Sequence, residues 1–115
     1  MTRTSGPLPR IEIPSIGVNA RVVNAYTNSR KKLIPPASIK IAGWWAGGTV
    51  PGERGPAVVV GHVNDTRRPG VFQRLRDMKR GAVIRYHHRD GSVDSFIAVR
   101  GEQHRKNMFP TRRVY

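Results

Sequence analysis

The 115-residue sequence contains no cysteine, which excludes disulfides, cysteine-ligated metal sites and thiol catalysis within these residues. It also lacks any apolar run near the roughly 18 residues that a membrane-spanning helix needs. Residues 1–10 carry charges and prolines but no apolar segment typical of a signal peptide. No internal repeat is present, and the length fits a single domain.

Acidic residues are scarce. The sequence has 7 Asp and Glu against 21 Lys and Arg, which gives a net charge of +14. Such a charge attracts phosphates, anionic lipid and acidic wall polymers, so a membrane surface is a candidate partner. The basic residues form only short runs, so a solvated basic surface is the default expectation. No recognised nucleic-acid-binding motif accompanies them.

Turn-forming residues are abundant, with 12 Gly and 9 Pro. Together with scattered Val and Ile, they predict short strands joined by turns. The expected strands lie at residues 10–14, 18–25, 39–46, 57–61, 82–86 and 93–99, and one short helix is expected at residues 71–78. This tally predicts an all-β fold, a small antiparallel barrel or sandwich over residues 9–115, with residues 1–8 as a flexible linker.

The sequence GPAVVVGHV at residues 55–63 is the most informative stretch. Its uncharged, β-branched run at residues 57–61 predicts a strand buried on both faces. His62 follows at the end of that strand, a position where an acid/base group could reach the rim of a sheet. A histidine at the end of a strand is nevertheless more often structural than catalytic.

Other candidate residues are weaker. Trp44 and Trp45 could wall a groove for an extended peptide, although at least one indole is expected to cap the core. A metal site would need the fold to gather the histidines, because no His-x-x-x-His spacing occurs among His62, His87, His88 and His104. No cofactor is expected. The Asp90-Gly91 pair predicts a hairpin, with His87 and His88 exposed near its turn.

Several stretches, in this order and spacing, resemble the sortase family, most closely its actinobacterial class F members. They are IEIPSIGVNA at residues 11–20, AGWW at 42–45, PGERGPAVVVGHV at 51–63, VFQRL at 71–75 and FPTRRVY at 109–115. The block at residues 51–63 is the most specific of them.

This resemblance implies a closed β-barrel of eight strands and a cysteine transpeptidase on the outer membrane face of Gram-positive bacteria. A thiolate would attack the Thr–Gly bond of an LPxTG-like sorting signal, a histidine would exchange protons and an arginine would steady the oxyanion. The acyl group would then pass to an amine of the cell wall. Only the histidine maps onto this chain, at His62.

The chain departs from the family pattern in several ways. The family's cysteine and arginine come after the segment that matches residues 114–115, and no arginine of this chain takes the catalytic position. Asn64 stands where the family usually has Asp, and the membrane anchor has no counterpart. We therefore expect about six of eight barrel strands, no activity in this form and an undetermined location. Two alternatives stay open: a non-catalytic peptide or wall-polymer binding module, and a basic nucleic-acid-binding small barrel.

Overall fold

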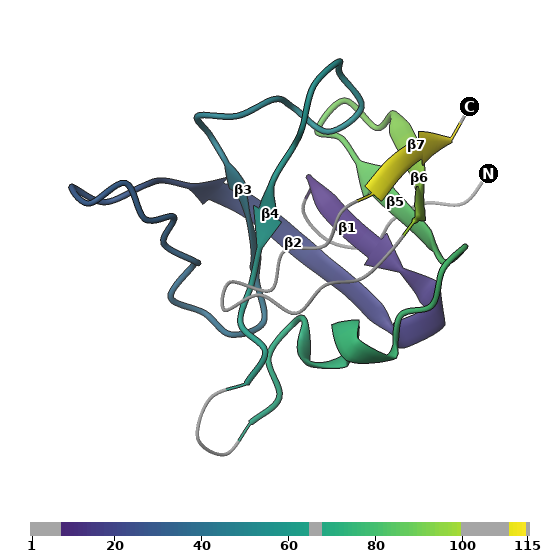
Figure 1. The fold of residues 1–115 in the computed structure, drawn as a ribbon, viewed down its shortest axis with the longest axis horizontal. Coiled ribbons are helices and arrows are strands. Elements are labelled where there is room, and N and C mark those ends of the chain that lie inside the picture. The colour runs from purple at the N-terminus through teal and green to yellow at the C-terminus, as the bar shows by residue number, and fades with distance from the viewer. Residues whose placement is uncertain (1–7, 65–67, 100–110, 115) are drawn as a thin grey trace.

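The structure is a computed structural model that describes residues 8–64, 68–99 and 111–114. Its described part is a single curled sheet of seven strands in the order β4-β3-β2-β1-β5-β6-β7 (Figure 1). The strands are β1 (Arg10–Ile13), β2 (Val18–Ala25), β3 (Ala42–Trp45), β4 (Val59–Val60), β5 (Val83–His87), β6 (Val93–Ala98) and β7 (Thr111–Val114). The all-β expectation is confirmed, and the curl is that of a half-barrel.

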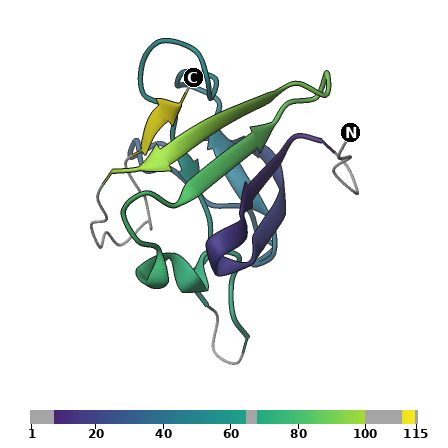
Figure 2. The same cartoon turned by 90° about the vertical axis from the view of Figure 1, so that its right-hand side faces the viewer.

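All but one of the pairings between these strands are antiparallel. The exception is the parallel pair of β2 and β3, which the expectation of an antiparallel barrel did not include. Parallel neighbours need a long crossover, and residues 26–41 provide it. The hairpin of β5 and β6 lies beside β1, and Figure 2 shows its two long strands running together.

The core lies on the concave side of the sheet. In β1 and β2, buried Ile11, Ile13, Val18, Ala20 and Val22 alternate with polar or exposed residues. This period of two is what a half-buried strand requires. Ile84 and Tyr86 of β5 complete the same apolar cluster from the hairpin.

The expected helix is a 3-10 helix, η2 (Gln73–Asp77), not an α-helix. Its flanking residues Phe72 and Met78 are buried, which accounts for the apolar spacing of the segment. Five residues are too few for stable α-helical turns, whereas short 3-10 turns are common connectors. A second one, η1 (Pro14–Ile16), forms the turn between β1 and β2 and ends at Gly17, which has φ 71°.

The strand expected at residues 57–61 is much shorter than predicted. Only Val59 and Val60 pair, with β3, and β4 lies at one edge of the described sheet. Val60 is buried but Ala57 is exposed, so the run is not a strand buried on both faces. β-branched residues favour strand geometry, but the ladder extends only where a neighbouring strand supplies partners.

The far end of the described sheet was not expected. β7 pairs with β6 in a segment whose sequence shows no clear period. The first seven residues of the expected linker lie outside the described residues, and so does His104. Within the described ranges, no helix is long and apolar enough to cross a membrane.

Candidate active site

His62 lies just beyond β4, half-buried, with its ring held by the main chain of a distant segment. Its Nε2 atom is 2.7 Å from the carbonyl oxygen of Pro36. A carbonyl oxygen only accepts hydrogen bonds, so Nε2 carries the proton of this bond. In the neutral ring, Nδ1 is then the nitrogen that can accept a proton.

Pro36 is itself fixed by close packing against β3. A methyl group on Gly43 would lie 2.8 Å from Cβ of Ala25 and 3.0 Å from Cδ of Pro36. Glycine at position 43 therefore lets the proline approach the backbone of β3. This approach sets the position of the carbonyl group that holds His62.

Two further glycines fix the backbone of His62. A methyl group on buried Gly61 would lie 2.7 Å from Cδ2 of Phe72 and 2.6 Å from Cγ1 of Val71. A methyl group on Gly70 would collide with the carbonyl oxygen of His62 and lie 2.6 Å from its carbonyl carbon. The same carbonyl oxygen accepts a hydrogen bond from the Phe72 N–H at 3.0 Å. His62 is thus clamped on its backbone by the segment that leads into η2.

The two tryptophans pack against different apolar clusters. Trp44 is half-buried against the main core, and its indole N–H donates to the carbonyl oxygen of Thr49 at 2.8 Å. Trp45 packs with Ala25, Leu33 and Val60. Both indoles are therefore supported by the fold, as the expectation of a core-capping indole anticipated. A role for either in binding a peptide stays a prediction.

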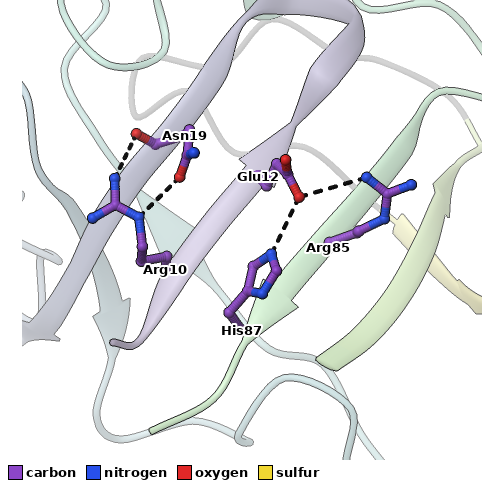
Figure 3. Close-up of polar contacts among 5 residues, drawn as sticks. All are labelled: Arg10, Glu12, Asn19, Arg85 and His87. Atoms are coloured by element: carbon purple, nitrogen blue, oxygen red, sulfur yellow. Dashed lines mark hydrogen bonds and ion pairs between the residues drawn. The ribbon is translucent and has the colours of Figure 1, made fainter. Parts of the chain in front are cut away.

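The side chain of His87 is largely buried, contrary to expectation. Its side chain is 15% exposed, and its Nε2 is 3.2 Å from Oε1 of Glu12 (Figure 3). Nη1 of Arg85 lies 3.5 Å from the same carboxylate oxygen. These contacts join β1 to β5 on the convex face, because Glu12 and Arg85 are opposite each other in the ladder. They make His87 part of a cross-strand polar cluster.

His88 is also half-buried, and it pairs with a carboxylate of the neighbouring strand. Its Nε2 is 2.7 Å from Oδ2 of Asp94, and its ring lies 5.0 Å from the ring of Tyr86, tilted by 60°. The expected exposure fails because the hairpin register brings Tyr86 opposite Asp94, directly beside His88. At the turn itself, hydrogen bonds from the Ser92 side chain and backbone lower the pKa of Asp90. This supports the expected structural role of Asp90.

Tyr86 gives the hairpin a measurable dependence on pH. Burial raises the pKa of Tyr86 from 10.0 to about 12, because the apolar core disfavours the phenolate. Between those two values the unfolded chain releases the phenol proton while the folded chain keeps it. We therefore expect this residue's contribution to the free energy of unfolding to fall as pH rises from about 10 to about 12. Denaturant titrations of wild type and Tyr86→Phe measure it.

The Tyr86→Phe variant also serves as the control, since it shares every other titrating group with the wild type. The difference in unfolding midpoint between the two proteins should change above pH 10. A difference that stays constant through that range would contradict the assignment of the shift to Tyr86.

Among the described residues, no three His, Asp or Glu side chains gather into a possible metal site. At His62, the carbonyl oxygen of Pro36 orients the ring through Nε2. The sortase domain family model matches residues 11–111 of the chain. The chain belongs to the sortase family. Neither a curated protein nor a solved structure matched it.

The supports of His62 in this sortase domain were not identified from the sequence. Pro36 contacts His62 through its backbone carbonyl group. Every residue has such a group, so the residue type at position 36 does not predict this contact. Gly43 and Gly70 lie 19 residues before and 8 residues after His62. Their role depends on contacts between distant segments. Only Gly61 could be linked to His62 from the sequence, because it directly precedes His62 in the block at residues 51–63.

Proposed function

We propose that this sortase domain binds LPxTG-like sorting signals and that His62 is its proton-exchanging residue. The match of the sortase family over residues 11–111 carries the proposal. The orientation of His62 supports it, because the bond to Pro36 directs protonation to Nε2 and leaves Nδ1 for a reacting group. Within the family we assign the domain to the class F type of actinobacteria, on the sequence block at residues 51–63.

The 115 residues by themselves contain no cysteine. A thioacyl intermediate needs a thiolate, and the imidazole of His62 is not a substitute for it in this chemistry. We therefore propose that this form of the domain binds its peptide without cleaving it. In the complete reaction, the acceptor would be an amine of the Gram-positive cell wall and the site of action the cell surface.

Titration with an LPxTG-type peptide tests this proposal directly. We expect a saturable change in the ring resonances of His62 in nuclear magnetic resonance spectra, and no cleaved peptide by mass spectrometry. His87 and His88 are internal controls, because each is held by a carboxylate away from the His62 supports. A peptide of the same composition in scrambled order should produce no change.

Two results would overturn the proposal. The first is the absence of any saturable signal, and the second is a saturable signal that leaves His62 unchanged while other residues respond.

Reading the gene beyond the codon for Tyr115 adds a separate test, since a following frame that encodes a cysteine-bearing strand and a later arginine would supply the two missing groups.

A further inference from the structure

The crossover between β2 and β3 contains a small ribbon at residues 26–34 that extends from the sheet at the left of Figure 1. Thr27 and Leu33 form an isolated antiparallel bridge, and the Ile34 N–H donates to the Tyr26 carbonyl oxygen at 3.0 Å. Leu33 is buried against the body of the domain. The ribbon is therefore attached to the fold through one face.

The other face of this ribbon is apolar and exposed. Tyr26 and Ile34 lie opposite each other next to the bridge, on the face that Leu33 does not use. Tyr26 is 63% exposed and Ile34 is 48% exposed, which are the two highest values among the large apolar side chains described. A partner that covered this exposed tyrosine and isoleucine would gain free energy, because their apolar surface would leave water.

The tip of the ribbon is basic and well defined. Oδ1 of Asn28 accepts hydrogen bonds from the backbone N–H groups of Arg30 and Lys32, at 2.8 and 3.0 Å. Lys31 takes the left-handed conformation, with φ 61°, at the turn between them. All three basic residues are exposed. No acidic residue occurs anywhere in residues 13–52, so no nearby carboxylate in the sequence neutralises the tip.

We propose that this ribbon docks the domain on an anionic lipid bilayer. Basic residues at a negatively charged membrane surface each contribute roughly 1 kcal/mol of attraction. Tyrosine favours the interface between water and lipid, and isoleucine gains free energy when it enters the apolar layer. A dissolved wall polymer would neutralise the tip but would leave the Tyr26 and Ile34 side chains in water. A nucleic acid could stack a base on Tyr26 but would offer no apolar layer to Ile34. The combination therefore favours a bilayer.

Sedimentation with lipid vesicles tests the proposal on the chain as it stands. We expect binding to vesicles that contain phosphatidylglycerol and little binding to pure phosphatidylcholine vesicles. The triple variant Arg30→Gln, Lys31→Asn, Lys32→Gln should bind roughly 100-fold more weakly. The asparagine accommodates the left-handed backbone of position 31. The pair Tyr26→Ser and Ile34→Ser should weaken binding roughly tenfold without any change of charge.

A matched control removes three exposed basic residues elsewhere, with Arg54→Gln, Arg76→Gln and Lys79→Gln. It has the same net charge as the tip variant but leaves the ribbon intact, so its affinity should fall by less than about threefold. The proposal is overturned if wild type does not bind anionic vesicles, or if both charge variants lose affinity equally. It is also overturned if Tyr26→Ser and Ile34→Ser leave binding unchanged and soluble polyphosphate binds as tightly, which would indicate a polyanion site.

Discussion

Replacing Gly70 with alanine is expected to lower the free energy of unfolding by roughly 3 kcal/mol or more. The added methyl group would collide with the His62 carbonyl oxygen and would lie 2.9 Å from the carbonyl carbon of Val63. Both obstacles are backbone atoms, which no change of side-chain rotamer moves aside. Relief requires the two segments to separate, and this breaks the Gly70 N–H bond to the Val63 carbonyl oxygen and the Phe72 N–H bond to His62.

Chemical denaturation measures this loss, and Gly81→Ala is its control. Gly81 has φ 89° and open space around its Cβ position, so its substitution carries only the backbone strain of about 1–2 kcal/mol. Gly70 lies outside that left-handed range, so its loss is entirely steric. In any folded fraction of Gly70→Ala the His62 ring resonances should move. A loss no greater than that of Gly81→Ala, with His62 unchanged, would contradict the backbone clamp.

Local pattern predicted most of the fold. Alternating burial in β1 and β2 follows from a period of two, and the Asp90-Gly91 turn follows from the backbone that such a pair favours. The sequence also brought His62 forward as the candidate acid/base group. The sequence could not show contacts made by backbone groups, such as the Pro36 carbonyl group. It also could not show the close approach of two backbone segments that glycine allows at position 70.

The errors have a common physical origin in pairing between strands, which the local sequence pattern does not determine. A β-branched run at residues 57–61 has high strand propensity, but only two of its residues find partners on β3. Residues 111–114 show no apolar period, yet they pair with β6, because backbone groups rather than side chains make a ladder. His87 and His88 looked exposed because turns usually are, and cross-strand register placed Glu12 and Asp94 against them.

Gly52→Ala is expected to destabilise the domain by roughly 3–4 kcal/mol, from two separate causes. Residues 50–53 form a turn in which the Glu53 N–H donates to the Val50 carbonyl oxygen, and Gly52 takes φ 94° after Pro51. An alanine there would be strained by its backbone alone. Its methyl group would also collide with the Asp94 carboxylate, which is the partner of His88. The connection between β3 and β4 would then lose its contact with β6.

The hairpin offers a control that separates these two causes, because Gly91 has φ 90° and nothing within 4 Å of its Cβ position. Gly91→Ala should therefore cost only about 1–2 kcal/mol. In an Asp94→Ala background the collision is absent, so Gly52→Ala should fall to that same value, with a coupling energy of roughly 1–2 kcal/mol. If Gly52→Ala cost the same in both backgrounds, the carboxylate would not be what holds the turn at residues 50–53 against β6.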